Sequence, residues 1–185
     1  EPSDLYDWFK GWEDLKPALV DQLHSNPPEL SEDMYNDGYK NIVNNDFSEI
    51  VIENMKQKYK ETAPDMDWLV MDVMDMKELP DASFDVAIDK GTMDAIMCEK
   101  GDSWELDPKI AERCHLMCAE VARILKPGGK YIQITFGQPH FRKRVLVKPE
   151  YNWELQTRTV GEFFHYFIYI MTKATTSEPA TTESS

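Results

Sequence analysis

Apolar residues recur along the chain at two spacings, which predict an alternation of helices and short strands. Leucines at every fourth position within residues 3–24 predict an amphipathic helix. A second, shorter helix is expected from about Pro28 to Asp37, and Gly38 stands where a glycine commonly follows a helix. Both helices precede the first run that has the character of a strand.

Four short runs, bounded by polar or turn residues, predict strands buried in a sheet. They are Asn41–Asn44, Trp68–Met71, Phe84–Ile88 and Tyr131–Phe136. Helices are expected between them, because Ser48 is a typical N-cap and Asp107 with Pro108 has the pattern of an N-cap and first helical residue. Strands that alternate with helices favour a parallel sheet covered on both faces.

The last third of the chain predicts an antiparallel addition to this sheet. The run at residues 126–129, Lys-Pro-Gly-Gly, is expected to end one helix abruptly and to turn into the following strand. Two later runs, Trp153 to Val160 and Phe163 to Met171, are close enough to pair as a hairpin around Gly161. The predicted fold class is therefore α/β, with three layers and a mostly parallel sheet that has an antiparallel C-terminal edge.

Size and composition are typical of one folded domain. The chain has 185 residues, of which 42% are hydrophobic and 29% are charged. We expect a domain over residues 1–173 and a disordered tail over residues 174–185, which are rich in Thr, Ser, Glu and Pro. Three cysteines are too few for a disulfide framework and indicate a reducing compartment. No apolar run reaches the ~20 residues that span a bilayer, so the expected location is the cytoplasm.

The net charge is strongly negative and unevenly distributed. It amounts to −14 for the whole chain. Residues 1–120 hold 11 basic against 29 acidic residues, and residues 121–185 hold 9 against 5. An acidic surface repels nucleic-acid phosphates and anionic lipids and attracts basic partners, although such charge also serves solubility alone. We therefore expect a basic partner, no nucleic acid, no membrane, and a monomer.

Carboxylates stand at the ends of three predicted strands, at Asp46, Asp72 and Asp89. In open α/β sheets, ligands bind at the carboxyl ends of the strands, and an acid after the second strand of a nucleotide-binding fold accepts hydrogen bonds from a ribose diol. A single loop acid more commonly caps a helix or faces solvent. Three acids at consecutive strand ends favour a nucleoside-type ligand.

Two motifs resemble those of a known family. Residues 121–130, Val-Ala-Arg-Ile-Leu-Lys-Pro-Gly-Gly-Lys, resemble the helix-to-strand turn of class I, seven-β-strand methyltransferases that use S-adenosylmethionine. Residues 81–95 resemble the fourth-strand motif of one branch, the lysine methyltransferases that act on translation elongation factor 1-alpha and are related to the endothelin-converting enzyme 2 methyltransferase-like domain. Residues 6–9, 29–35 and 138–142 are similar to the same branch. The resemblance covers about residues 4–173 and implies a Rossmann-like sheet.

The resemblance implies a binding role for each strand-end acid. Asp46, followed by Phe47, is expected to bind the ribose hydroxyls of S-adenosylmethionine. Asp72 with Val73 is expected to frame the adenine. Asp89 is expected to face the transferred methyl group and the incoming amine, so it is predicted to be both a cofactor-binding and a catalytic residue.

The reaction that the resemblance implies is methyl transfer to a lysine of a basic protein such as elongation factor 1-alpha. Only the neutral amine is nucleophilic, and the reference pKa of lysine is ~10.4. A carboxylate such as Asp89 or Asp94 would orient the amine by accepting a hydrogen bond, while its charge favours the protonated amine. Orientation is therefore the role expected of these two residues. The target lysine and the number of methyl groups stay open.

One part of the family pattern is missing from the chain. The family has an apolar first strand that ends in a glycine-rich loop, directly before the segment that begins here at Glu29. In its place stand residues 24–28, which end in two prolines without N–H groups, and no glycine occurs between Gly11 and Gly38. That loop brings backbone N–H groups to the methionine half of the cofactor, and the strand lies between the second and fourth strands. Its absence predicts weak cofactor binding and unpaired strand edges.

Several interpretations stay open at this point. The gap reflects either an omission of about ten residues from the sequence or a pseudoenzyme. The alternatives to lysine methylation are a non-catalytic binding module that has lost the cofactor and a small-molecule methyltransferase with a closed apolar pocket. Cys114, His115 and Cys118 have a metal-like spacing, but both cysteines fall on the apolar stripe of a predicted helix, so no metal is expected.

Overall fold

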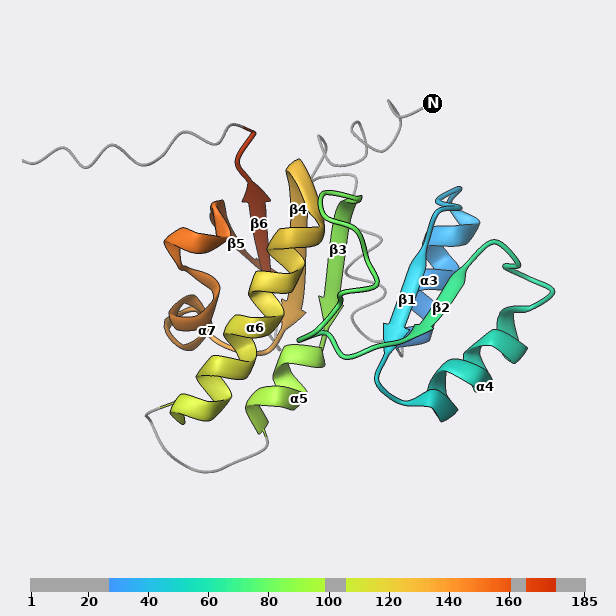
Figure 1. Ribbon diagram of the computed structural model, residues 1–185, viewed down its shortest axis with the longest axis horizontal. Helices are drawn as coiled ribbons and strands as arrows, with labels where there is room; N and C mark the ends of the chain where they lie inside the picture. Colours follow the sequence, from blue (N-terminus) through green and yellow to red (C-terminus); the bar gives the residue numbers. More distant parts are fainter. Residues whose placement is uncertain (1–26, 99–105, 161–165, 176–185) are drawn as a thin grey trace, which may run out of the picture. The chain divides into compact units, whose positions relative to one another are not determined.

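The computed structural model describes residues 27–98, 106–160 and 166–175. The chain divides into two compact units, each with a sheet of its own (Figure 1). The first unit comprises Glu1–Asp72 and Val160–Phe164, and the second comprises Val73–Thr159 and His165–Ser185. Helices and strands alternate along most of the described chain, which confirms the predicted α/β class.

The first unit contains a two-stranded parallel sheet and two described helices. The elements are α3 (Pro27–Asn36), β1 (Val43–Asp46), α4 (Glu49–Tyr59) and β2 (Asp67–Val70). The register pairs Val43 with Asp67 and Asp46 with Val70, so both strands end at the same edge. One buried core cluster consists of Tyr35, Tyr59, Ala63 and Met66.

Helix boundaries in the first unit follow the predicted signals. Helix α3 ends at Asn36, and Gly38 adopts a φ of +106°, in the left-handed region that glycine favours. The Ser48 hydroxyl accepts a hydrogen bond from the Val51 N–H at 3.4 Å, as an N-cap of α4 should. Both predictions are confirmed.

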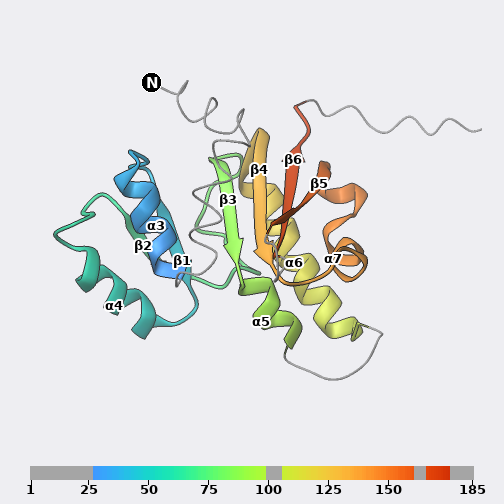
Figure 2. The same ribbon diagram turned by 180° about the vertical axis from the view of Figure 1, so that it is seen from behind.

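The second unit contains a four-stranded mixed sheet in the order β3-β4-β6-β5. Its strands are β3 (Phe84–Lys90), β4 (Leu125–Thr135), β5 (Trp153–Val160) and β6 (Tyr166–Lys173). Its described helices are α5 (Thr92–Cys98), α6 (Pro108–Ile124), α7 (Pro139–Leu146) and the 3-10 turn η1 (Pro149–Tyr151). Strand β4 is parallel to β3 and antiparallel to β6, which confirms the predicted antiparallel edge. Helix α6 lies across one face of this sheet in both views (Figures 1 and 2).

Helix α6 begins and packs as its sequence predicts. The Asp107 carboxylate accepts a hydrogen bond from the Lys109 N–H at 2.8 Å, and Pro108 occupies the first turn. The thiols of Cys114 and Cys118 are fully buried on the apolar face of the helix. These contacts confirm the predicted N-cap and the predicted apolar stripe.

The connection from α6 to β4 is tighter than predicted. Strand β4 begins at Leu125, directly after the last helical residue. Its pairing with β3 is interrupted between Leu125 and Lys130, where the partner strand advances by only two residues. Residues 126–129, with Gly128 at a φ of +80°, therefore form a bulge within β4 rather than a turn before it.

The sheet that the family resemblance implies is continuous, whereas the described strands form two sheets. Among the described residues, β1 pairs only with β2, and β3 pairs only with β4. Among the described residues, no strand occupies the place of the family's first strand, so the absence of that strand stays a prediction. One edge of β1 and one edge of β3 thus have no partner strand in the described part of the chain.

Some predictions fall outside the described residues, and some elements were not predicted. Three predictions concern residues that the structure does not describe: the helix within residues 3–24, the turn at Gly161 and residues 176–185 of the tail. The boundaries of the single domain, 1–173, and of the tail, 174–185, stay predictions. Sequence analysis did not predict α5, α7 or η1, although Pro139 at the start of α7 is a recognisable helix-initiating signal.

Candidate active site

Asp46 ends β1 in the first unit and begins the turn into α4. Its Oδ1 accepts a hydrogen bond from the Ser48 N–H at 2.8 Å, so one carboxylate oxygen caps the turn. No hydrogen bond from a described residue reaches Oδ2. The following side chain, Phe47, is 83% exposed. An open carboxylate oxygen beside an exposed aromatic ring suits a nucleoside, and the ribose-binding role of Asp46 stays a prediction.

Asp72 and Val73 follow β2, as the adenine prediction requires. Asp72 is exposed to solvent and Val73 is half-buried. Neither observation tests a contact with adenine, so that role also stays a prediction.

The loop that follows Val73 is held on α6 by Arg123, which sequence analysis missed. The guanidinium donates hydrogen bonds to the carbonyls of Met76 at 2.7 Å and Leu79 at 2.8 Å. It also forms an ion pair with Glu120 at 2.9 Å, and this contact lowers the pKa of the Glu120 carboxyl. Arg123 lies inside the motif at residues 121–130, which was the available signal.

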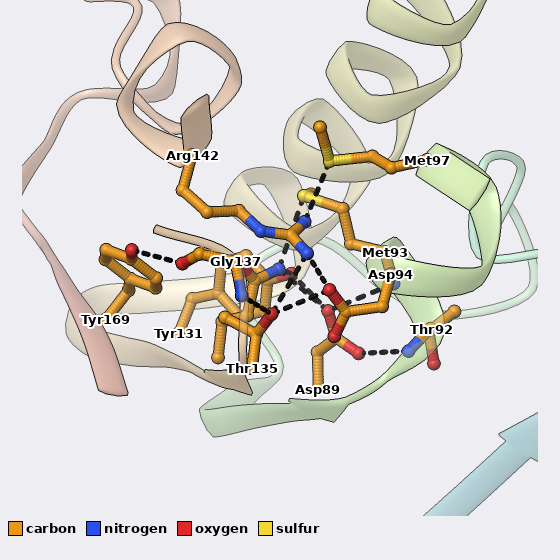
Figure 3. Close-up of polar contacts among 11 residues, drawn as sticks. Asp89, Thr92, Met93, Asp94, Met97, Tyr131, Thr135, Gly137, Arg142 and Tyr169 are labelled. Carbon is orange, nitrogen blue, oxygen red and sulfur yellow. Dashed lines mark hydrogen bonds and ion pairs between the residues drawn. The ribbon is translucent and has the colours of Figure 1, made fainter. Parts of the chain in front are cut away.

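Asp89 is buried near the end of β3, with 4% of its surface exposed (Figure 3). Its Oδ1 accepts a hydrogen bond from the Thr92 N–H at 2.8 Å, and its Oδ2 accepts one from the Met93 N–H at 3.4 Å. Asp89 therefore caps the N-terminus of α5. Oδ2 also accepts hydrogen bonds from Gln133 Nε2 at 2.8 Å and from the Tyr131 hydroxyl at 3.2 Å. Four protein donors thus converge on one carboxylate.

Burial and hydrogen bonding act in opposite directions on the pKa of the Asp89 carboxyl. Burial raises the pKa of the Asp89 carboxyl, while hydrogen bonds from Gln133 and from backbone N–H groups oppose that change. Gln133 Oε1 is buried and accepts no hydrogen bond from a described residue. The predicted contacts of Asp89 with the cofactor and the amine stay predictions.

Asp94, in the first turn of α5, forms an ion pair with Arg142 of α7 (Figure 3). Arg142 Nη2 donates to Asp94 Oδ1, and the Thr135 hydroxyl donates to the same oxygen at 2.6 Å. The Arg142 side chain is 3% exposed, whereas the Asp94 side chain is 33% exposed. The second catalytic candidate therefore differs from Asp89, because its carboxylate reaches the surface.

Alternating polar residues of β4 join the two aspartates in one network. Side chains at every second position of a strand share a face, and here these are Tyr131, Gln133 and Thr135. The first two donate to Asp89, and Thr135 donates to Asp94. Sequence analysis missed all three, although polar residues alternating with isoleucine in a buried strand were a visible signal.

The cysteine pair of α6 has no metal ligand set around it in the described residues. Burial raises the pKa of the Cys114 thiol to about 11. The Nδ1 atom of His115 lies 2.7 Å from the Tyr151 hydroxyl instead. Among residues 27–98, 106–160 and 166–175, no group of three or more His, Cys, Asp or Glu is placed to hold a metal ion.

Within the same described ranges, no helix is both long enough and apolar enough to cross a membrane.

Comparison with known proteins gives matches in sequence. A family model described as a methyltransferase domain matches residues 28–133. EEF1A lysine methyltransferase 4 of Mus musculus is 32% identical over 180 residues, which cover 92% of this chain and 70% of that protein. The eEF1A lysine and N-terminal methyltransferase of Homo sapiens is 42% identical over 118 residues, which cover 64% of this chain and 16% of that protein.

Comparison with solved structures gives matches in fold. A SAM-dependent methyltransferase from Methanosarcina mazei superposes with a TM-score of 0.56 at 18% identity, covering 79% of this chain and 87% of that chain. The fold and the family match define a class I, Rossmann-like SAM-dependent methyltransferase. Within that class, the chain belongs to the branch of the EEF1A lysine methyltransferases. The resemblance drawn from residues 81–95 and 121–130 is thereby confirmed.

Proposed function

We propose that the chain transfers a methyl group from S-adenosylmethionine to a lysine side chain of a basic protein of the elongation factor 1-alpha type. The observation that carries this proposal is the placement of Asp94, a partly exposed carboxylate just beyond the carboxyl end of β3. Arg142 and Thr135 hold one of its oxygens. Relatives named for eEF1A lysine methylation support the class of substrate.

The residues present suit one half of the cofactor better than the other. The open Oδ2 of Asp46 suits a ribose diol, which needs acceptors for two hydroxyl groups. The methionine half carries a carboxylate that backbone N–H groups normally bind. Two consecutive prolines begin α3, where the family has its glycine-rich loop, and they offer no N–H. We therefore infer that the chain binds the ribose end as its family does and the methionine end weakly.

The bound cofactor would supply an electrophilic methyl group on a sulfonium, and the protein's contribution is mainly to position the amine. Positioning of two reactants alone accelerates such reactions by a large factor. Asp94 accepts a hydrogen bond from the neutral amine through Oδ2 and so orients its lone pair. Asp89 caps the start of α5, the helix that carries Asp94. We also keep a direct contact of Asp89 with the cofactor and the amine as part of this proposal.

Transfer of radiolabelled methyl groups to purified elongation factor 1-alpha tests the proposal. Incorporation into the protein, and none into a panel of small amines, is the expected result. Asp94→Asn keeps the shape of the side chain and should lower incorporation at least tenfold, because Arg142 and Thr135 would hold the amide oxygen and the amine would meet an NH₂ group, which cannot accept its hydrogen bond. Incorporation into small amines alone would favour the small-molecule alternative.

A non-catalytic binding module is the second candidate, and the missing glycine-rich loop favours it. Such a module would bind the basic partner without binding the cofactor. Calorimetry with S-adenosylhomocysteine separates the two functions: measurable binding supports the enzyme, and partner binding with no cofactor binding supports the module.

The remaining expectations about partners belong to the same proposal. A basic protein surface is the expected partner because residues 1–120 hold 29 acidic against 11 basic residues. Association should weaken as salt is added, since exposed charges are screened within ~8 Å at physiological ionic strength. We also propose that the chain is monomeric, resides in the cytoplasm and binds neither nucleic acid nor membranes.

A further inference from the structure

We propose that Arg142 is a positioning residue that holds the Asp94 carboxylate in the orientation that leaves its second oxygen open to the acceptor amine. This inference rests on the proposed function, because it assigns Arg142 a part in lysine methylation. Arg142 itself is buried and acts only through Asp94.

The donors around Asp94 are arranged asymmetrically. Arg142 Nη2 and the Thr135 hydroxyl both donate to Oδ1, while no described residue donates to Oδ2. Arg142 Nη2 also donates to Thr135 Oγ1 at 3.0 Å, so the three groups form a closed triangle. A carboxylate held through one oxygen by two donors keeps a fixed plane, and its other oxygen keeps a fixed direction.

Arg142 is in turn fixed from its other sides. Its Nη1 donates to Met97 Sδ at 3.0 Å, which ties α7 to the last turn of α5 (Figure 3). Gly137 packs against the guanidinium so closely that a Cβ built there would overlap Arg142 Nε and lie 3.0 Å from Nη2. Only glycine at position 137 therefore leaves room for the side chain of Arg142.

Gly137 is itself held by two hydrogen bonds. Its N–H donates to Thr135 Oγ1 at 2.9 Å, and its carbonyl accepts a hydrogen bond from the Tyr169 hydroxyl at 2.6 Å (Figure 3). A continuous set of contacts thus runs from β6 through Gly137 and Arg142 to Asp94. Such support from the surrounding residues is what holds a reactive group in a fixed geometry.

A purely structural tie between α5 and α7 is the competing explanation of the same contacts. It predicts that loss of the ion pair lowers stability and activity together. A positioning role predicts that kcat falls while KM for the protein substrate and the melting temperature change little. Arg142→Lys separates the two, since it keeps the charge but loses the planar fork, in which Nη2 reaches Asp94 and Thr135 while Nη1 reaches Met97.

The test compares Arg142→Lys and Gly137→Ala with a matched control on the same helix. Lys143 is exposed on α7, so Lys143→Gln removes a positive charge without touching Asp94. Misplacement by about 1 Å can lower a rate on the order of 100-fold. We expect that loss in kcat for Arg142→Lys and Gly137→Ala, with KM within about twofold, and no change for Lys143→Gln. Parallel losses of kcat and melting temperature in Arg142→Lys would overturn the inference; Gly137→Ala is judged by kcat and KM alone, because the overlap of its Cβ with Arg142 itself lowers stability.

A double-mutant cycle checks that Arg142 acts through Asp94. Once Asp94 is replaced by Asn, adding Arg142→Lys should lower kcat by less than about twofold further. Independent, multiplicative losses in the Asp94→Asn/Arg142→Lys double variant would contradict the proposed dependence.

A readout without cofactor or substrate separates this inference from the proposed function. In protein labelled with ¹³C at the aspartate carboxyl carbons, the Asp94 resonance should move in Arg142→Lys and in Gly137→Ala but not in Lys143→Gln. An unmoved resonance in both variants overturns the inference whatever the activity. A moved resonance in a chain that methylates no protein supports the hold of Arg142 on Asp94 and overturns the proposed function.

Discussion

At the scale of single residues, the two catalytic candidates differ in what surrounds them. Asp89 lies near the end of β3, and Asp94 follows five positions later in the first turn of α5. Asp89 accepts hydrogen bonds from four protein donors and is buried, whereas Asp94 is partly exposed and is held through one oxygen. The donors that make this difference come largely from β4, about forty residues further along the chain. Asp89 thus supports the start of α5, and Asp94 is the better placed to meet an amine.

Asp89 should make the stability of the protein depend on pH. Burial raises its pKa in the folded state, while the unfolded value is ~3.9. The folded state therefore binds the proton more tightly, and stability falls as the pH rises from about 4 through the folded-state pKa. Asp89→Asn removes this dependence because an amide does not titrate, and the Gln133 amide can rotate to present Oε1 to the new NH₂ group. Urea unfolding at pH 4, 5.5 and 7 should show that the stability of Asp89→Asn increases relative to that of the parent as the pH rises.

Asp89→Ala is the contrasting variant. It removes the cap of α5 and leaves Gln133 and Tyr131 without their acceptor, so it should cost on the order of 3 kcal/mol. A difference in unfolding free energy between Asp89→Asn and the parent that stays the same at every pH would contradict the titration argument.

Asp46 should matter more to cofactor binding than to stability. Asp46→Asn keeps an oxygen for the Ser48 N–H, so the turn into α4 should survive. A ribose diol that loses a carboxylate acceptor should bind more weakly by about 1–3 kcal/mol. Calorimetry with S-adenosylhomocysteine measures the affinity, and thermal melting measures the stability.

Asp67→Asn is the matched control for Asp46. It makes the same substitution at the opposite end of the same two-stranded sheet, at the first residue of β2. Equal losses of S-adenosylhomocysteine affinity in the two variants, or no loss in either, would contradict the ribose-binding role of Asp46.

At the scale of elements, the loop between β2 and β3 owes its shape to a helix that follows it in the chain. Arg123 near the end of α6 bonds two carbonyls of the loop, and Ala82 and Ser83 donate N–H groups to the carbonyls of Arg123 and Ile124. Glu120 accepts a hydrogen bond from the Met76 N–H at 2.7 Å. The loop therefore forms only when α6 is in place.

Arg123→Ala should destabilise the second unit by about 1–3 kcal/mol, because two partly buried loop carbonyls lose their donor. Lys126→Ala is the control, since Lys126 pairs with Asp85 where both side chains are about half exposed. Surface ion pairs contribute about 0–1 kcal/mol. Denaturant unfolding of the two variants measures both values, and equal losses would show that the Arg123 contacts are no stronger than a surface pair.

At the scale of the whole molecule, the described strands form two separate sheets, and none of them takes the place of the family's first strand. Backbone N–H and C=O groups along the edges of β1 and β3 have no strand partner among the described residues. Unpaired backbone groups are costly when they are buried and promote association when they are exposed. In the family, the loop that follows the first strand binds the methionine half of the cofactor. Restoring the strand together with its loop should therefore raise both stability and cofactor affinity.

Insertion of about ten residues before Glu29, forming an apolar strand and a glycine-rich loop, should restore both properties. The parent should show little stabilisation by S-adenosylhomocysteine. The restored protein should melt at a higher temperature and gain ~2.7 kcal/mol more at a ligand concentration 100 times its dissociation constant. Melting curves of both proteins, with and without ligand, measure the two effects. A full ligand shift in the parent would mean that another segment binds the methionine half.

Local sequence signals predicted the elements whose ends are marked by side chains near in sequence. Ser48, Asp107 with Pro108, and Gly38 each act within a few residues, and the structure confirms all three. Helix α5 escaped prediction because its cap, Asp89, was interpreted as a ligand-binding acid. The bulge at residues 126–129 escaped because pairing with β3 extends β4 back through a Pro-Gly-Gly run that by itself predicts a turn.

The sequence by itself determined the family and the alternation of strands and helices, and it predicted the loss of the glycine-rich loop, because motifs, periodicity and missing glycines are properties of neighbouring residues. Only the tertiary structure decided which acids are buried and which are open. Asp94 has its exposed oxygen because Arg142 and Thr135, from α7 and β4, occupy the other one. Asp89 is enclosed because β4 brings Tyr131 and Gln133 beside β3. These contacts join residues about forty positions apart, and such pairings depend on packing that no local pattern encodes.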